Sequence, residues 1–411
     1  MTRVLVVVGH GMAGHRLVEE IRSGDRSGRW RIVVVAEEPR PAYDRVSLSS
    51  YLDGRTAADL DLTTPRLRAD PLVDLRLSTR AVHLDRATRT MTCADSTVLE
   101  YDALVLATGS RPFVPPVPGR DLAGCFTYRT IEDLDALRAA VRPGEPGVVI
   151  GGGLLGLEAA RALRLLGARP YVVEMAPHLM PLQVDEGGGR VLARLVGELG
   201  VGVHCGRGLA SLHAGPDGRV RAVTLSDGTE LPASTVVFAA GVRPRDELAR
   251  SAGLERAGRG GFLVDERCRT ADEHVWAVGE CAAVLGRCYG LAAPGHRMAE
   301  AVARQLLGSP AAAFPGADMS AKLKVLGVEV AGFGDVHARS EGAVEFVRED
   351  RAAGTYGKLV LAPDGRTLLG GVLAGDTAGY AVLRSLLGRE LTAPAGLLLA
   401  AGAAGVDARR P

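Results

Sequence analysis

The chain has 411 residues, of which 24% are charged and 47% are hydrophobic. At roughly 100–200 residues per domain, this length predicts more than one domain, with enough chain to bury sizeable cores. The 49 basic and 48 acidic residues leave a net charge of +1. Nucleic-acid and anionic-membrane binders usually carry a basic excess, so this balance argues against both partners. An aromatic content of 4% also argues against a base-stacking platform.

The sequence shows no targeting or membrane-spanning pattern. Its first apolar run, Val4–Val8, stops at Gly9 and is too short for either. The six cysteines form no C-x-x-C pair, which disfavours a thioredoxin-type redox pair, iron–sulfur spacings and most zinc sites. The nine histidines show no metal-ligand spacing either. We therefore expect a cytoplasmic protein with free thiols and no metal.

The first informative segment is a strand, a turn and a helix at the N-terminus. Val4–Val8 is typical of a fully buried strand and leads into the turn Gly9-His-Gly-Met-Ala-Gly14. A helical stretch follows to about Ser23. A second β run over Arg31–Ala36 ends at the acidic pair Glu37-Glu38.

The same pattern returns in a second segment. Val148–Ile150 predicts a strand, and the turn Gly151-Gly-Gly-Leu-Leu-Gly156 follows it. A helix is expected to about Leu166, and a strand over Tyr171–Val173 ends at Glu174. The sequence therefore uses one strand–turn–helix–strand unit twice.

Both turns match the dinucleotide-binding fingerprint G-x-G-x-x-G. The first glycine allows a tight turn, the second lets backbone N–H groups approach a pyrophosphate, and the third allows close helix–strand packing. The helix N-terminus offers unpaired donors to the phosphates, and the acid that closes the second strand accepts hydrogen bonds from ribose. These glycines are Gly9, Gly11 and Gly14 in the first turn and Gly151, Gly153 and Gly156 in the second.

A single such turn is weak evidence for a dinucleotide site, because a glycine-rich turn that binds no ligand can have the same sequence. Here both copies follow a β run, precede a helix and end at an acid, as the fingerprint requires. The pair therefore predicts two dinucleotide sites.

Three further β runs end at glycine and are expected at the ligand edge of a nucleotide-binding sheet. The runs begin at Leu104, Val236 and Val275. For each run, the alternative interpretation is an ordinary strand that ends at a turn. The candidate residues at their ends are Thr108, Gly109, Gly241, Gly279 and Glu280, the last of which could hold the ribityl hydroxyls of a flavin.

Composition also suggests the domain boundaries. A proline-rich connector between Pro112 and Pro118 leads into the second unit, and Pro244 leaves it. The β-like runs Lys322–Val330, Val344–Val347, Lys358–Leu361 and Leu368–Leu373 predict an antiparallel α+β module. We expect a discontinuous FAD-binding domain at 1–118 and 244–320, an NAD(P)H-binding domain at 119–243 and a C-terminal α+β interface domain at 321–411.

The whole chain resembles the FAD- and NAD(P)-dependent pyridine nucleotide-disulfide oxidoreductases, a class that includes ferredoxin, rubredoxin and glutathione reductases. Within it, the chain most resembles the NAD(P)H-oxidising N-terminal half of assimilatory nitrite reductase large subunits. Besides the two glycine turns, the resemblance rests on Glu37-Glu-Pro-Arg-Pro-Ala-Tyr-Asp-Arg-Val-Ser-Leu-Ser-Ser50, Tyr128-Arg-Thr-Ile-Glu-Asp-Leu134, Gly279-Glu-Cys281, Ala293-Pro-Gly-His-Arg-Met298 and Ser320-Ala-Lys-Leu-Lys-Val-Leu-Gly327.

The resemblance implies an α/β fold of two Rossmann-like domains plus the C-terminal α+β domain, with FAD in the first unit and NADH, or NADPH, in the second. It places Glu158 near the nicotinamide carboxamide as the catalytic residue; an ordinary helix surface charge is the alternative. Candidate cofactor-binding residues beyond those already named are Met12, Ala13, Arg45, Val82, Arg129, Leu154 and Leu155. The sequence does not show whether Glu37 or Glu38 binds the ribose of FAD.

Two departures from the resemblance matter. The nitrite reductase large subunits continue into cysteine-rich iron–sulfur and siroheme regions, whereas this chain stops at Pro411, so we expect it not to reduce nitrite by that chemistry. Dioxygenase-type ferredoxin reductases have lysine where Ser50 stands, and that lysine is expected to pair with the glutamate matching Glu158. Its absence disfavours dioxygenase-type use.

We therefore expect an enzyme that oxidises NADH through FAD and passes electrons to a separate iron–sulfur or other redox protein, as the donor component of nitrite or nitrate assimilation. An NADH-dependent ferredoxin or rubredoxin reductase for another system is one alternative, and a slow-turnover flavin-carrying signalling protein is another. Glu174 predicts a preference for NADH, since a 2′-phosphate would meet a like charge there. The sequence does not decide whether the protein forms a homodimer.

Overall fold

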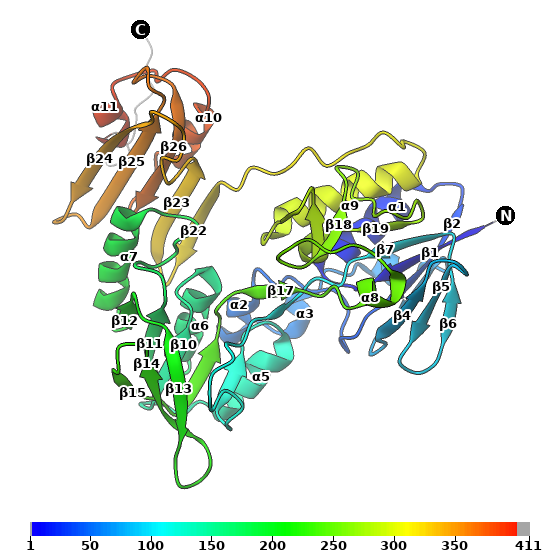
Figure 1. Cartoon of the computed structure of the whole chain (residues 1–411), viewed down its shortest axis with the longest axis horizontal. Coiled ribbons are helices and arrows are strands. Elements are labelled where there is room, and N and C mark those ends of the chain that lie inside the picture. The colour runs from blue at the N-terminus through cyan, green and yellow to red at the C-terminus, as the bar shows by residue number, and fades with distance from the viewer. Residues whose placement is uncertain (1, 401–411) are drawn as a thin grey trace. The chain divides into compact units, whose positions relative to one another are not determined.

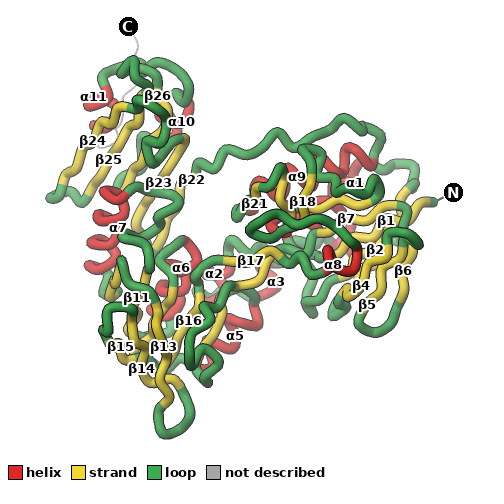
Figure 2. The backbone as a smooth tube through the Cα atoms, viewed as in Figure 1, coloured by secondary structure: helices red, strands yellow, loops and turns green. Residues whose placement is uncertain are grey.

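The computed structural model describes residues 2–400, which divide into two compact units (Figures 1 and 2). Within these residues, the first unit comprises 2–111, 129–131 and 242–317, and the second comprises 112–128, 132–241 and 318–400. The C-terminal segment is thus grouped with the second glycine-rich unit. The three-domain division expected from the sequence stays a prediction.

The first unit is built on a five-stranded parallel sheet in the order β19-β7-β1-β2-β3. Helix α1 follows β1, and α9 packs against α1 (Figure 1). The strands of this sheet are β1 (Arg3–Val8), β2 (Trp30–Val35), β3 (Val73–Arg76), β7 (Ala103–Leu106) and β19 (Val275–Ala277), and the two helices are α1 (Met12–Gly24) and α9 (Ala292–Leu306).

Short elements complete the first unit. They include an antiparallel meander, β4-β5-β6, which the sequence analysis did not identify. These elements are α2 (Leu48–Leu52), α3 (Ala57–Leu60), α4 (Pro65–Arg68), β4 (Ala81–Asp85), β5 (Thr90–Cys93), β6 (Val98–Glu100), β8 (Ser110–Pro112), β17 (Val242–Pro244), α8 (Leu248–Ala252), β18 (Phe262–Val264), the 3₁₀ turn η1 (Gly279–Cys281), β20 (Ala282–Val284) and β21 (Arg287–Cys288).

The second unit repeats the parallel arrangement in the order β12-β11-β10-β16-β9. Helices α6 and α7 follow β10 and β11 along the chain, and a second meander, β13-β14-β15, accompanies the sheet. The elements are β9 (Cys125–Thr127), α5 (Ile131–Ala140), β10 (Pro146–Ile150), α6 (Leu154–Leu165), β11 (Arg169–Glu174), α7 (Glu186–Glu198), β12 (Gly202–Cys205), β13 (Leu209–Ala214), β14 (Val220–Leu225), β15 (Glu230–Pro232) and β16 (Thr235–Phe238).

The C-terminal segment forms an antiparallel sheet in the order β22-β23-β26-β25-β24, flanked by two short helices. Its core includes Phe333, Leu359 and Leu368, all almost fully buried. The elements are β22 (Ala321–Val325), β23 (Val328–Gly334), β24 (Val344–Asp350), β25 (Thr355–Leu361), β26 (Leu368–Ala374), α10 (Tyr380–Ser385) and α11 (Ala395–Ala400).

The fold class expected from the sequence is confirmed, and the strands of both glycine-rich units begin within two residues of their predicted starts. One expectation is wrong: Lys322–Val330 is not a single strand. Leu326 and Gly327 have φ of 52° and 89°. Two consecutive left-handed residues are typical of a two-residue hairpin turn, so the run folds back on itself as β22 and β23.

No helix within residues 2–400 is long and apolar enough to cross a membrane. All six cysteines lie in this part of the chain and are free thiols, as expected.

A buried lysine ties the C-terminal sheet to α7 within the second unit. Lys358 of β25 is 2% exposed, and its Nζ lies 3.0 Å from Asp185 and 3.5 Å from Glu345. Asp185 also caps α7 by accepting from the Gly188 N–H at 3.0 Å, and it accepts from the Tyr356 hydroxyl at 2.7 Å. One carboxylate therefore connects the helix to the sheet.

Replacing Lys358 with methionine is expected to lower the free energy of unfolding of the second unit by about 3 kcal/mol, because the Asp185 carboxylate then stays partly buried without its cation. Hydrogen exchange of the β25 amides measures the loss. The exposed Lys322→Met variant is the control, and adding Asp185→Asn to Lys358→Met should recover part of the loss. Equal exchange in Lys358→Met and Lys322→Met would show that the pair contributes nothing.

Candidate functional site

The first glycine turn uses its three glycines for different reasons. Gly9 has φ +110°, and a Cβ on it would lie 2.2 Å from the carbonyl oxygen of Ala107. A Cβ on Gly14 would lie 2.2 Å from the carbonyl oxygen of Gly9. Gly11 has φ −80°, and nothing lies within 4 Å of where its Cβ would be. The fold itself requires Gly9 and Gly14, whereas Gly11 faces space that a ligand could fill.

The second turn shows the same pattern. Gly151 has φ +116°, and a Cβ there would lie 2.3 Å from the Ala239 carbonyl oxygen. A Cβ on Gly156 would lie 1.8 Å from the carbonyl oxygen of Gly151. Gly153 has φ −78° and nothing within 4 Å of its Cβ position. In both turns the middle glycine is the one that the protein's own packing does not explain.

Each turn opens onto a helix whose first donors are uncapped. Met12 and Ala13 begin α1, and Leu154 and Leu155 begin α6; neither helix has a side-chain hydrogen bond at its N-cap. The first N–H groups of a helix have no partner within it and carry its positive dipole end. Both turns are therefore suited to bind a pyrophosphate, which is the group that a dinucleotide presents.

The acidic pair after β2 is engaged by cations. Glu37 pairs with Arg245. Glu38 pairs with Arg45 and accepts from the Tyr43 hydroxyl at 2.8 Å. Both carboxylate oxygens of Glu38 are therefore used, Oε1 by Arg45 and Oε2 by Tyr43, whereas Arg245 contacts only Oε2 of Glu37.

A second ion pair continues this set within the first unit. Glu280 of η1 pairs with Arg129 and accepts from the Ser110 hydroxyl at 2.7 Å. Arg45 in turn donates to the Arg129 carbonyl oxygen at 3.0 Å. The structure thus brings together residues from three separate parts of the sequence: Glu38 with Arg45, Arg129, and Glu280.

The remaining candidate residues of the first unit occupy strand ends. Thr108 donates its hydroxyl to the Arg245 carbonyl oxygen at 2.5 Å, and Gly109 has φ +68°. Gly279 has φ +78° and lies beside Ala13 of α1. Val82 is 40% exposed at an irregularity in the β4–β5 pairing. In the second unit, Gly241 has φ +100°, and its carbonyl oxygen accepts from the Phe113 N–H at 2.9 Å.

Sequence reasoning missed a buried histidine in the first turn. His10 is 7% exposed, and its Nδ1 accepts from the Ala42 N–H at 3.0 Å. Burial lowers the pKa of His10 to about 3, so the ring is neutral and can accept at Nδ1. This bond fastens the segment containing Tyr43 and Arg45 to the glycine turn. The position of His10 between two glycines in the sequence did not indicate this role.

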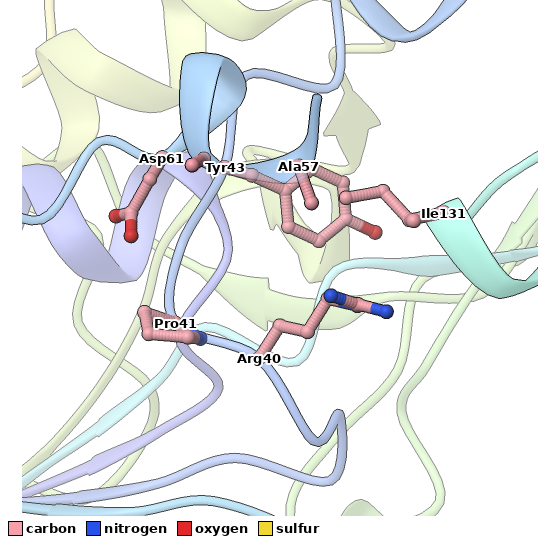
Figure 3. A pocket seen from close by; sticks show the side chains of 7 residues that line it. Arg40, Pro41, Tyr43, Ala57, Asp61 and Ile131 are labelled. Atoms are coloured by element: carbon pink, nitrogen blue, oxygen red, sulfur yellow. The ribbon is translucent and has the colours of Figure 1, made fainter. Parts of the chain in front are cut away.

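A small pocket lies beside the same segment in the first unit. Figure 3 shows the side chains of Arg40, Tyr43 and Asp61 on its walls. Its full lining is Arg40, Pro41, Tyr43, Ala57, Ala58, Asp61 and Ile131. Arg40 and Tyr43 belong to the run from Glu37 to Ser50 that carries the family resemblance, but no role was expected for either residue.

In the second unit, Glu174 closes β11 with its carboxylate held in place. Oε2 accepts from the Gly152 N–H at 2.6 Å and Oε1 from the Ala176 N–H at 2.7 Å. These amides stabilise the charged carboxylate and fix its orientation beside the second glycine turn. A Cβ on Gly152 would lie 2.8 Å from the Glu174 Cβ, so this glycine is needed for the acid to reach the turn.

Glu158 of α6 is the most perturbed acid in the second unit. Burial raises the pKa of Glu158 to about 7, against a smaller opposing effect of Arg161. Tyr128 is 3% exposed, and its hydroxyl has no hydrogen-bond partner in the described residues. Burial, and then the charge of Glu158, raises the pKa of Tyr128. An acid that titrates near neutrality thus lies close to an orphaned buried hydroxyl, a combination more typical of a functional site than of a surface charge.

Comparison with known proteins agrees with this geometry. Residues 3–304 match the family described as "Pyridine nucleotide-disulphide oxidoreductase", and residues 320–391 match the "Rubredoxin NAD+ reductase C-terminal domain". The chain is 46% identical to the nitrite reductase [NAD(P)H] large subunit of Klebsiella oxytoca over 95% of this chain and 40% of that protein. It is 34% identical to the assimilatory nitrate reductase electron transfer subunit of Bacillus subtilis over 91% of this chain and 48% of that subunit.

Among solved structures, a ferredoxin reductase from Rhodopseudomonas palustris superposes with a TM-score of 0.83 at 28% identity, covering 95% of this chain and 96% of that one. The chain spans less than half the length of the two nitrite and nitrate reductase relatives. The resemblance stated from the sequence motifs is confirmed. The chain belongs to the pyridine nucleotide-disulphide oxidoreductase family.

Proposed function

We propose that this chain oxidises NADH through a bound FAD and passes the electrons to a separate redox protein, as the donor component of nitrite or nitrate assimilation. Its family consists of NAD(P)H-dependent oxidoreductases that bind FAD. The observation that carries the proposal is the repeated turn in which Gly11 and Gly153 face open space before an uncapped helix. Two such turns in one chain suit two dinucleotides.

For FAD, we assign the first unit. Gly11 and the first amides of α1 would hold the pyrophosphate, and Glu37 would accept from the ribose. Glu37 is favoured over Glu38 because one of its carboxylate oxygens has no side-chain partner, whereas the side chains of Tyr43 and Arg45 cover both oxygens of Glu38. Glu280 and Arg129 would line the flavin side of this domain, which we take to comprise 1–118 and 244–320.

For NADH, we assign the second unit. Gly153 and the first amides of α6 would hold the pyrophosphate, and Glu174 would accept from the adenosine ribose. Two backbone amides fix the carboxylate of Glu174, one on each oxygen, and each oxygen can accept a further hydrogen bond from the ribose; a 2′-phosphate would meet a like charge there. At 4 Å and an effective dielectric near 20, that repulsion is about 4 kcal/mol before screening.

FAD, when bound, takes a hydride from the nicotinamide ring and releases the two electrons to an acceptor. The role that we assign to the chain is to bind and orient. Glu158 would hold the carboxamide of the nicotinamide, and above its pKa its negative charge would stabilise the positive ring that forms as hydride leaves.

For the acceptor, we propose a separate iron–sulfur or other redox protein. The six cysteines are free, and the Bacillus subtilis relative is named an electron transfer subunit. Lys322, Lys324 and Arg339 are exposed on the C-terminal domain and suit an acidic partner.

We place the protein in the cytoplasm. A ferredoxin reductase is the second candidate function, favoured by the R. palustris structure.

The first prediction from this proposed function concerns FAD. Gly11→Val should lower FAD occupancy of the purified protein at least tenfold, because the added side chain fills the space assigned to the pyrophosphate. Bound flavin is measured by absorbance after denaturation. Gly258→Val is the control, since Gly258 is exposed in the same unit and also has nothing within 4 Å of its Cβ position. Full occupancy in Gly11→Val would refute the assignment of this turn.

The second prediction concerns pH. The rate of flavin reduction by NADH should rise with a midpoint near pH 7, as Glu158 loses its proton. Glu158→Gln should lower the rate about tenfold at pH 8 and remove this titration. Stopped-flow absorbance measures both. The exposed Glu230→Gln variant should behave like the unmodified protein. An unchanged midpoint in Glu158→Gln would show that another group titrates.

The third prediction concerns the acceptor. NADH-dependent reduction of cytochrome c should be slow with this protein alone and should rise at least tenfold when a ferredoxin or cognate iron–sulfur subunit is added. The stimulation should fall with salt if the basic residues steer the partner. Rapid saturable turnover with a small metabolite, and no stimulation by any redox protein encoded beside it, would contradict the proposal.

A further inference from the structure

Arg207 lies directly beside the segment that holds Glu174. It follows β12 and stands between Gly206 and Gly208. The Arg207 N–H donates to the Glu174 carbonyl oxygen at 3.1 Å, and the Gly206 N–H donates to the Ala176 carbonyl oxygen at 2.8 Å. The backbone of Arg207 is therefore fixed against the residues assigned to the adenosine ribose.

The guanidinium of Arg207 is occupied by two partners. Its Nε lies 2.8 Å from Oδ2 of Asp227, and its Nη1 lies 3.1 Å from Nδ1 of His204. Because a guanidinium only donates, His204 must accept at an unprotonated Nδ1. Burial, and then the charge of Arg207, lowers the pKa of His204, so the histidine is neutral. Asp227 is thus the one anion in contact with this cation among the described residues.

Asp227 is held in position by the turn between β14 and β15. Its Oδ1 accepts from the Thr229 N–H at 3.0 Å, and this backbone bond is the main reason that the pKa of Asp227 is lowered. The Ser226 hydroxyl accepts from the Gly208 N–H at 3.0 Å, which fastens the same turn to the residue after Arg207. The anion is therefore set beside the cation by the backbone.

The pair itself is weak. The Arg207 and Asp227 side chains are 40% and 39% exposed, and ion pairs at such exposure contribute little to stability. A phosphate offers a guanidinium a doubly charged, bidentate partner, but an arginine whose charge a carboxylate already balances attracts it less than an unpaired arginine does. Asp227 therefore matters less for holding the fold than for keeping Arg207 neutralised.

We propose that Arg207 and Asp227 form a second determinant of the dinucleotide preference. Asp227 occupies Arg207, so that the fixed carboxylate of Glu174 alone meets the 2′ position and selects the hydroxyl. Without Asp227, Arg207 is free to bind a 2′-phosphate. This inference rests on the proposed binding of NADH to the second unit.

The experiment measures binding of two adenosine ligands that differ at the 2′ position, adenosine 2′,5′-bisphosphate and 5′-AMP, by calorimetry of the holoprotein. Asp227→Asn keeps an oxygen for the Thr229 N–H and removes the charge. It should bind the bisphosphate about tenfold more tightly and leave 5′-AMP binding unchanged. The ratio of kcat/KM for NADPH to that for NADH should rise by a similar factor, through KM for NADPH.

Two further variants complete the test. Adding Arg207→Ala to Asp227→Asn should abolish the gain. Glu198→Gln, which frees Arg194 from an exposed pair on α7, should give none. Unchanged bisphosphate affinity in Asp227→Asn, with NADH oxidation intact, would overturn this inference and leave the proposed function standing. Failure of the unmodified protein to bind either ligand would overturn both.

Discussion

The two parallel sheets depend on one steric constraint, the turn from the first strand into the first helix. In each unit the first glycine has a positive φ, and the third presses against its carbonyl oxygen, so neither position accepts a side chain. These two contacts draw α1 and α6 onto their strands. They also leave the middle glycines, Gly11 and Gly153, in front of uncapped helix ends. One packing solution therefore produces both the fold and the two turns that we propose as dinucleotide sites.

The charged residues beside the two glycine turns are held by different partners in the two units. In the first, acids pair with arginines, either within one loop, as Glu38 with Arg45, or between distant segments, as Glu280 with Arg129. In the second, Glu174 is held by backbone amides. Paired residues can exchange partners when a polar cofactor arrives, whereas a carboxylate held by backbone amides keeps its position. The second arrangement suits discrimination between NADH and NADPH, which differ at one phosphate.

The sequence predicted these units well because their signals are local. Glycine spacing, an apolar strand and a terminal acid lie within one short stretch, as from Val4 to Glu38. Interactions between distant residues were not predictable. No sequence pattern indicates that Arg129 forms an ion pair with Glu280, or that His10 is buried and accepts a hydrogen bond from Ala42. The run from Lys322 to Val330 misled because its apolar residues continue up to and beyond a turn in which Leu326 has a left-handed backbone. Only the glycine after it marks the break.

In the proposed function, one chain binds a flavin and a nicotinamide dinucleotide and transfers hydride between them. A decisive experiment mixes the FAD-loaded protein anaerobically with NADH deuterated at the transferred C4 position. We predict complete bleaching of the oxidised flavin absorbance by one equivalent of NADH, with a primary isotope effect on its rate. A flavin that stays oxidised under excess NADH, or a protein that binds no flavin, would contradict the account.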